Sequence, residues 1–311
     1  MSCTSASTCE VSVVAVRDFE IRDARFRQCI RTSANIERLF TGCRWTEGPV
    51  YFPAMRSLLF SDIPNDRVLR FDEQSEAVSV FRQPADYTNG NTVDRQGRLV
   101  SCQQGARRVV RTEHDGSITV LADRFEGKRF NSPNDVVVKS DDSIWFTDPS
   151  YGIDSNYEGF LAPSELGERR VYRIDPRSGA VRVVADGFAQ PNGLAFSVDE
   201  RRLYIVDSGK GRGIMRVFEV QGDELRGGDV FIECADGMYD GLRIDVNDRI
   251  WTSAGEAVHC HERDGTLLGR ILLPERVSNL CFGGPKRNRL YVTATSSLYS
   301  VLLAVSGAKT F

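Results

Sequence analysis

A short motif that recurs six times constrains this chain more than any other feature. In each copy, a residue with an oxygen-bearing side chain precedes an apolar run, and five of the six copies have Gly or Asp in the next position. The oxygen-bearing residues follow one another at intervals of 38 to 58 residues along a chain of 311 residues. They are Glu47, Asn89, Asn134, Asn192, Asp240 and Ser278.

Each copy of the motif is followed by the signs of a β-hairpin. A second apolar pair, such as Leu58-Leu59 or Ile144-Trp145, comes 10 to 12 residues later, with a turn containing Gly, Asp or Asn in between. Repeats of this length, built from short strands and tight turns, are typical of propeller blades. The sequence therefore predicts an all-β fold, a six-bladed β-propeller with four strands per blade.

The last repeat is one strand short, which predicts how the ring closes. After Ser278 the chain has apolar runs for only three strands, whereas residues 36–40 read as a strand that belongs to no complete repeat. Placed in the last blade, that strand would cover an exposed sheet edge. We therefore expect one propeller domain over residues 35–311, preceded by a partly irregular arm over residues 1–34 that packs on the outside.

Charge and composition argue against several classes of partner. The formal net charge is −3, so nothing points to a nucleic acid or an anionic membrane. No apolar run approaches the roughly 18 residues that a membrane helix needs, and the first residues lack the pattern of a secretory signal. These features favour a cytoplasmic protein.

The cysteines and histidines do not form a recognisable site. The eight cysteines contain no CxxC pair, so we interpret them as reduced and mostly buried thiols. His114, His259 and His261 match no zinc spacing. Because His259 and His261 alternate along a strand-like run, they should share one face of a sheet.

The repeated oxygen-bearing residues should meet in space. The first strand of each blade lines the channel of a propeller, so its leading side chain lies near its five equivalents. Such a group contains only oxygen-bearing side chains, and Glu47 and Asp240 supply two carboxylates. Ca²⁺ prefers oxygen ligands, and a divalent cation would offset the cost of burying two carboxylates. The alternative is that these residues only satisfy strand ends and channel water, since Asn and Asp are common in turns.

An insertion lies between the third and fourth repeats, where the interval reaches 58 residues. It runs from Tyr151 to Gly167 and is rich in Tyr, Asp, Glu and Gly. Long loops in compact domains are usually functional. We therefore expect it to form part of the mouth of the site.

Several stretches of the chain resemble one known family. They are Arg44 to Val50, Asn131 to Val136, Phe146 to Gly152, Pro191 to Phe196 and Asp240 to Arg243. They resemble the gluconolactonase and regucalcin family of six-bladed propeller lactonases, and the resemblance extends over about residues 35–305. It implies one divalent cation, Ca²⁺ in the first place with Mg²⁺, Mn²⁺ or Zn²⁺ also accepted. It implies that the ligands are Glu47, Asn134, Asn192 and Asp240, and that Asp240 also acts as the general base.

The chain departs from the family pattern at positions that would contact the hydroxyl groups of a sugar. Regucalcin-type members carry an Arg at the place of Ser132, and bacterial relatives often carry a His at the place of Gln104. These departures leave the identity of the lactone open. The candidate substrate-binding residues are Asn89, Gln104, Arg129, Ser132, Tyr151 and Ser278.

The resulting hypothesis is metal-assisted hydrolysis of a sugar lactone, with the cation polarising the carbonyl and Asp240 activating water. Two alternatives stay open at this point. One is another metal-dependent hydrolase of the superfamily, such as a phosphotriesterase-like enzyme, which would need a more apolar pocket. The other is a propeller that only binds a protein partner and has no use for a buried carboxylate pair.

Overall fold

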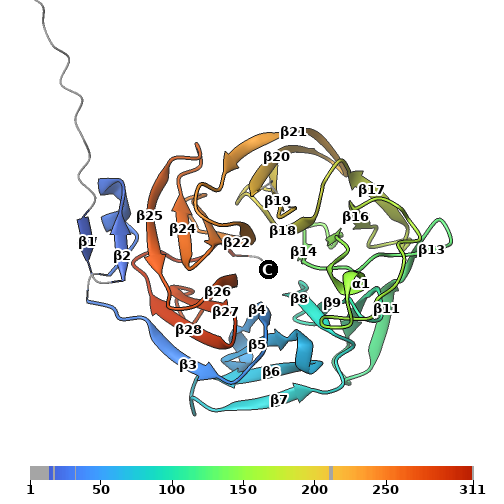
Figure 1. Cartoon of the computed structure of the whole chain (residues 1–311), viewed down its shortest axis with the longest axis horizontal. Coiled ribbons are helices and arrows are strands. Elements are labelled where there is room, and N and C mark those ends of the chain that lie inside the picture. Colours follow the sequence, from blue (N-terminus) through green and yellow to red (C-terminus); the bar gives the residue numbers. More distant parts are fainter. Residues whose placement is uncertain (1–13, 17, 32, 210–212, 310–311) are drawn as a thin grey trace, which may run out of the picture.

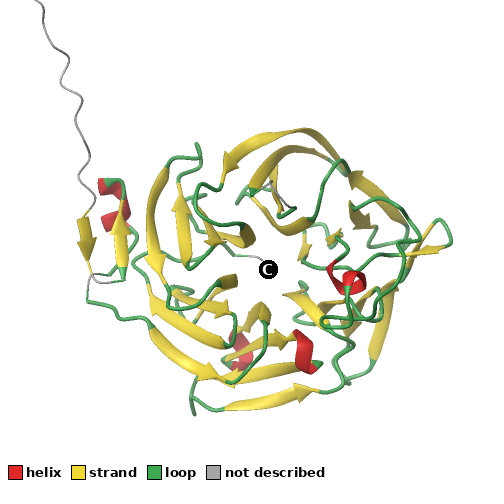
Figure 2. Cartoon of the chain, viewed as in Figure 1, coloured by secondary structure: helices red, strands yellow, loops and turns green. Residues whose placement is uncertain are grey.

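The computed structural model consists mainly of antiparallel sheets arranged as blades around a central channel (Figures 1 and 2). It describes residues 14–16, 18–31, 33–209 and 213–309. Within these residues six sheets radiate from the axis, and the innermost strands of neighbouring blades are in contact all the way round. The predicted six-bladed propeller is therefore confirmed.

The first three blades follow one another along the chain, each with its innermost strand first. Blade one contains β4 (Thr46–Phe52), β5 (Ser57–Asp62), β6 (Arg67–Asp72) and β7 (Val78–Arg82). Blade two contains β8 (Thr88–Val93), β9 (Leu99–Gln103), β10 (Arg108–Thr112) and β11 (Ile118–Ala122). Blade three contains β14 (Val136–Val138), β15 (Ile144–Asp148), β16 (Arg170–Ile174) and β17 (Val181–Ala185).

The other blades continue the same order, and two of them borrow strands from the start of the chain. Blade four contains β18 (Pro191–Phe196), β19 (Arg202–Asp207), β20 (Ile214–Gln221) and β21 (Glu224–Glu233). Blade five contains β22 (Tyr239–Ile244), β23 (Ile250–Ala254), β24 (Ala257–His261) and β25 (Leu267–Leu272), extended by β2 (Phe19–Ile21) and β1 (Val14–Val16). Blade six contains β26 (Val277–Gly283), β27 (Arg289–Ala294), β28 (Ser297–Leu302) and β3 (Glu37–Thr41).

The remaining elements are short. They are the β12–β13 hairpin (Arg124–Phe125 and Lys128–Arg129), the 3₁₀ turns η1 (Ala24–Gln28), η2 (Pro53–Met55) and η3 (Ile63–Asn65), and the helix α1 (Tyr151–Asp154). None of the helices in the described part of the chain combines the length and apolar character that crossing a bilayer requires.

The early strand closes the ring as the sequence predicts. β3 pairs antiparallel with β28, with Phe40 opposite Leu298 and Arg38 opposite Tyr299. Phe40 also packs edge-on against Phe60 of blade one, with the ring centroids 6.4 Å apart. The strand therefore joins the last blade to the first.

The described residues before β3 pack against blade five (Figure 1). β2 pairs with β25, and the Phe26 ring is fully buried 6.1 Å from the Trp251 ring. Ile30 forms a bridge with Leu303 near the end of the chain. These contacts fasten the described part of the arm to the outside of the propeller.

The apolar residues lie between the blades. Six buried clusters can be distinguished, and each occupies the interface between two neighbouring blades. Successive side chains of a strand point to opposite faces of its sheet. Apolar residues at consecutive positions therefore give each sheet two apolar faces, one toward each neighbouring blade. All six cysteines in the described residues are free, and five of them are buried.

His259 and His261 share one face of β24, as predicted, and both are buried. Their rings lie 5.8 Å apart, and Tyr239 Oη is 3.3 Å from His261 Nε2. Both nitrogens of His259 lack a hydrogen-bond partner among the described residues. Burial lowers the pKa of His259 to about 3 and that of His261 to about 4. Both histidine rings pack edge-on against the ring of Tyr239, the residue before Asp240.

Removing residues 1–42 should abolish cooperative folding. The truncation deletes β3, exposes the edge of β28 and uncovers the interface between blades six and one. Far-UV circular dichroism during urea unfolding would show the loss, with Met55→Ala, at a side chain that is 53% exposed, as the neutral control. A truncated protein that unfolds at the wild-type midpoint would contradict the role of β3 in closure.

Acid should destabilise the protein through the buried histidines. The pKa values of His259 and His261 are lower in the folded state than the ordinary 6.5, so the unfolded state takes up protons first as the pH falls. The stability contributed by the neutral histidines is therefore complete above pH 6.5 and is lost as the pH falls toward 4. Each should cost about 2 kcal/mol of unfolding free energy by pH 5. His259→Leu should remove about that much of the decrease between pH 7 and 5, measured by urea unfolding.

Val80→Leu is the control for this experiment, because Val80 is exposed and neither side chain titrates. It should leave the pH dependence of stability unchanged. Equal slopes for wild type and His259→Leu would show that His259 is not held neutral by burial.

Candidate active site

The repeated oxygen-bearing residues lie at irregular points of the innermost strands. In blade one, Glu47 is opposite Ser61 and Val50 is opposite Leu59, so β4 contains one residue more than its partner. Blades two, four, five and six have the same one-residue bulge around their repeated residue. In blade three, Asn134 lies two residues before the start of β14. Bulges redirect side chains, which explains why these residues leave the regular alternation of the strands.

Glycines beside these residues bring the innermost strands unusually close together. A Cβ atom on Gly193 would lie 2.2 Å from the backbone oxygen of Asp240, and one on Gly48 would lie 2.1 Å from that of Asn89. Gly90 is equally close to Asn134, and its N–H donates to the Asn134 carbonyl at 2.7 Å. No other residue type fits this spacing. The glycines therefore gather the repeated residues at one end of the channel.

Three buried aspartates fix the loops that lead into the repeated residues. Asp62 accepts a hydrogen bond from Arg44 N at 3.0 Å. Asp148 accepts bonds from the N–H groups of Asn131 and Ser132, both at 2.8 Å. Asp207 accepts bonds from the N–H groups of Ala189 and Gln190, the two residues before Pro191. Each aspartate thus holds a loop two or three residues before Glu47, Asn134 or Asn192. This support was missed at the sequence level.

Glu47 and Asp240 form a carboxylate pair, in which Glu47 is buried and Asp240 is half-buried. Glu47 is only 3% exposed, and its Oε2 accepts bonds from Gly48 N at 2.9 Å and Asn279 Nδ2 at 3.0 Å. Burial and the nearby charge of Asp240 raise the pKa of Glu47 well above its ordinary value. Burial raises the pKa of Asp240 to about 7, against the opposing charge of Arg276. Two carboxylates are therefore held together in a place with little water.

Asn192 and Tyr151 lie beside Asp240. A hydrogen bond from the Asn192 side chain lowers the pKa of Asp240, although burial raises it more. Burial and the charge of Asp240 raise the pKa of Tyr151, whose hydroxyl lies 3.5 Å from the Ser208 carbonyl and also reaches the Asn192 side chain. Tyr151 begins α1, so the insertion enters the site at its first residue.

A chain of amides connects the channel to the middle of the insertion. Asn89 Nδ2 donates to Gln104 Oε1 at 3.1 Å, and Gln104 Nε2 donates to the Glu158 carbonyl at 2.6 Å. Burial raises the pKa of the Glu158 carboxyl to about 7, and its charge in turn raises the pKa of Asp240. Two of the predicted substrate-binding residues thus hold Glu158 near the carboxylate pair.

Three other predicted residues use their polar groups for internal contacts. The Ser278 hydroxyl donates to the Thr46 carbonyl at 2.5 Å, and the Ser132 hydroxyl donates to the Pro149 carbonyl at 2.7 Å. Both side chains are fully buried. Arg129 is in the β12–β13 hairpin, where its guanidinium donates to the Ala106 carbonyl at 3.1 Å. Their part in substrate binding remains a prediction.

Sequence reasoning missed three residues near the carboxylate pair. Asn279 directly follows the predicted Ser278, and its side chain donates to Glu47. In the other five blades, the residue that directly follows the repeated residue is Gly or Asp. That equivalence is the signal that could have identified it. Glu158 and Arg276 come from loops, and the strand pattern carries no information about where loops pass.

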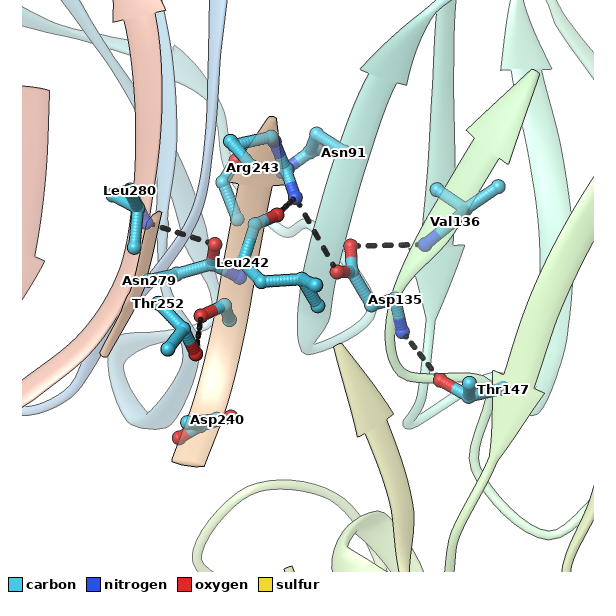
Figure 3. A network of polar contacts seen from close by, with 12 residues as sticks. Asn91, Asp135, Val136, Thr147, Asp240, Leu242, Arg243, Thr252, Asn279 and Leu280 are labelled. Atoms are coloured by element: carbon cyan, nitrogen blue, oxygen red, sulfur yellow. Dashed lines mark hydrogen bonds and ion pairs between the residues drawn. The ribbon is translucent and has the colours of Figure 1, made fainter. Parts of the chain in front are cut away.

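Further along the channel, Arg243 and Asp135 form an ion pair. Arg243 Nη1 lies 3.7 Å from Asp135 Oδ2 and donates to the Leu242 carbonyl at 2.6 Å, whereas Asp240 points away at the start of the same strand (Figure 3). Asp135 also accepts a bond from Val136 N at 2.9 Å. Burial raises the pKa of Asp135, and Arg243 opposes the rise.

The donor set suits a hard divalent cation. Within the described residues, no three His, Cys, Asp or Glu side chains come together as a metal-binding group. The predicted set differs, because it combines the carboxylates of Glu47 and Asp240 with the amides of Asn134 and Asn192. Mutual repulsion in the buried carboxylate pair is what a cation would relieve. Oxygen donors of these kinds fit Ca²⁺ or Mg²⁺ better than zinc.

Replacing Gly193 should disturb the site without touching its polar groups. In Gly193→Ala the new methyl group meets the Asp240 backbone, which cannot rotate away, so we expect a loss of about 1 to 3 kcal/mol in unfolding free energy. Urea unfolding measures it. Gly213→Ala, whose Cβ would be 3.2 Å from its nearest neighbour, is the control. Wild-type stability in Gly193→Ala would contradict the close packing at the axis.

Comparison with known proteins places this chain in a family. Two curated relatives cover most of the chain. A gluconolactonase from Zymomonas mobilis is 28% identical over 302 residues, which span 89% of this chain and 83% of the relative. The pentonolactonase XacC from Haloferax volcanii is 31% identical over 265 residues, which span 81% of this chain and 82% of the relative.

Solved structures agree with this placement. A gluconolactonase from Xanthomonas campestris matches with a TM-score of 0.88 at 36% identity, covering 92% of this chain and 95% of that one. A regucalcin from Agrobacterium tumefaciens, described as a calcium-binding protein, shares the fold with a TM-score of 0.72 at 20% identity. The family model for the SMP-30/gluconolactonase/LRE-like region matches residues 45–296, and the chain belongs to this family.

Proposed function

We propose that this protein hydrolyses a sugar lactone to the open-chain acid, using a divalent cation held at the channel end by Glu47, Asn134, Asn192 and Asp240. The reaction class rests on the comparisons: relatives named as lactonases cover most of the chain, and the chain is a lactonase of their family. The observation that carries the metal part is the buried carboxylate of Glu47, whose pKa is raised by burial and by the nearby charge of Asp240.

The choice of a divalent cation has further support. The donors are carboxylate and amide oxygens, and a regucalcin with the same fold is described as calcium-binding. We propose Ca²⁺ in the first place, with Mg²⁺, Mn²⁺ or Zn²⁺ as possible replacements. When bound, such an ion supplies Lewis acidity that polarises a carbonyl and stabilises developing negative charge on its oxygen.

We propose that Asp240 transfers the proton. Its carboxylate is hydrogen-bonded to the Asn192 side chain, which also bonds to the Tyr151 hydroxyl. In the proposed reaction Asp240 accepts a proton from the attacking water as the new C–O bond forms at the carbonyl carbon. It returns that proton to the ring oxygen as the lactone C–O bond breaks. The products are the hydroxyl group and the carboxylic acid of the open chain.

The surroundings of the site favour a hydroxylated substrate. Asn89, Gln104, Glu158, Tyr151 and Arg276 contribute amide, carboxyl, phenol and guanidinium groups around the carboxylate pair. Such groups suit the hydroxyls of a sugar acid lactone better than the apolar substituents of a phosphotriester. We propose that the insertion from Tyr151 to Gly167 forms the wall that contacts these hydroxyls.

Asp240→Asn should lower the turnover of an aldonolactone by at least about 100-fold, because the amide cannot accept the proton. Ring opening can be followed by acid release with a panel of five- and six-membered aldonolactones and one phosphotriester, each with and without chelator. Asp264→Asn, at an exposed turn in blade five, is the control that should keep full activity. A fully active Asp240→Asn variant with bound metal would exclude Asp240 as the base.

Glu47→Gln should weaken the binding of Ca²⁺ by at least about tenfold, because the site loses one of its two carboxylates. Isothermal titration calorimetry with the metal alone measures this without any substrate. Excess Ca²⁺ should restore part of the activity. The exposed Glu126 provides a matched control, Glu126→Gln, with unchanged affinity. Equal Ca²⁺ affinity in Glu47→Gln and wild type would remove Glu47 from the ligand set.

A further inference from the structure

A second cavity opens at the other end of the channel, away from Glu47 and Asp240. Its volume is about 490 Å³, within the range of small-molecule sites. Every innermost strand contributes an apolar residue to its wall, three or four positions beyond the repeated oxygen-bearing residue. These residues are Val50, Val93, Val138, Phe196, Ile244 and Phe282.

A polar layer separates this cavity from the candidate active site. Asn91 and Arg243 line the cavity, and Arg243 pairs with Asp135 in the channel behind them (Figure 3). Asn91 Nδ2 donates to the Gly48 carbonyl and to Ser61 Oγ, both at 3.0 Å, while its Oδ1 accepts from Ser101 Oγ at 2.6 Å. Because Asn91 already has these partners, it is a fixed part of the layer.

The charges around the cavity are unbalanced. Arg287 and Lys309 line it together with Arg243, which is already paired with Asp135, and Glu200 is the one acidic side chain among its described lining residues. Glu200 is already engaged, since it accepts a bond from Ser140 N at 2.8 Å and lies 3.4 Å from Lys139 Nζ. Arg287 Nη1, in contrast, is buried and has no hydrogen-bond partner among the described residues. A buried guanidinium N–H without an acceptor is costly unless a ligand satisfies it.

We propose that this cavity is a second binding site that takes a small monocarboxylate with an apolar body. The carboxylate would accept hydrogen bonds from Arg287, with Lys309 adding positive charge. The hydrocarbon part would lie against the ring of Val and Phe side chains from the six blades. This site is independent of lactone hydrolysis, because it lies beyond the polar layer and uses none of the residues proposed for that reaction.

The test is calorimetric titration of the full-length protein with octanoate, and with octanol as an uncharged probe of the same length. Octanoate should bind saturably at one site and more tightly than octanol. Arg287→Gln should weaken octanoate binding by about tenfold or more, because it removes a charged donor, and should leave octanol binding nearly unchanged. Arg263→Gln, at an exposed turn outside the cavity, is the charge-matched control.

A second variant tests the location independently. Val138→Trp places a large side chain in the cavity and should abolish binding of both probes, with folding checked by circular dichroism. The proposal is overturned if octanoate does not bind saturably, or if folded Arg287→Gln or Val138→Trp binds it as wild type does. It is equally overturned if Glu47→Gln removes octanoate binding, because the anion would then occupy the candidate active site.

Discussion

The close approach of the innermost strands around the axis is the constraint on which the rest of the structure depends. Glycines beside the repeated residues allow the backbone of one blade to touch that of the next, as Gly193 does with Asp240. Gly241 lies equally close to the Asn279 side chain, which donates to Glu47, so these contacts bring Glu47 and Asp240 near each other although they are far apart in the sequence. The energetic consequence is two desolvated carboxylates with raised pKa values. A cation at that point relieves the repulsion and supplies Lewis acidity, so packing at the axis and the proposed chemistry have a common origin.

The outer parts of the molecule make this arrangement rigid. Six apolar clusters fill the interfaces between blades, and β3 joins the last blade to the first. Asp62, Asp148 and Asp207 then bind the loops that lead into the channel. Each level limits the movement of the next, so a small set of side chains can keep its geometry at the end of the channel. Such preorganisation is what electrostatic catalysis requires.

The sequence predicted the parts that periodicity encodes. The spacing of the repeats gave the six blades, and the missing last strand gave the position of β3. Periodicity could not reveal that Ser278 turns its hydroxyl to the Thr46 carbonyl while Asn279 binds Glu47, because a bulge shifts side chains by one position. It also could not place Glu158, since the path of a loop depends on contacts such as that with Gln104. The cavity at the other channel end depends on which side chains fill the axis, and strand patterns do not specify that.

The most direct test of the central claim is a crystal structure of the protein soaked with Mn²⁺, with the ion located by its anomalous scattering. The account predicts one strong peak at the channel end, within about 2.0 to 2.6 Å of oxygens from Glu47, Asn134, Asn192 and Asp240. A peak elsewhere, or four side chains too far apart to reach a common ion, would contradict it.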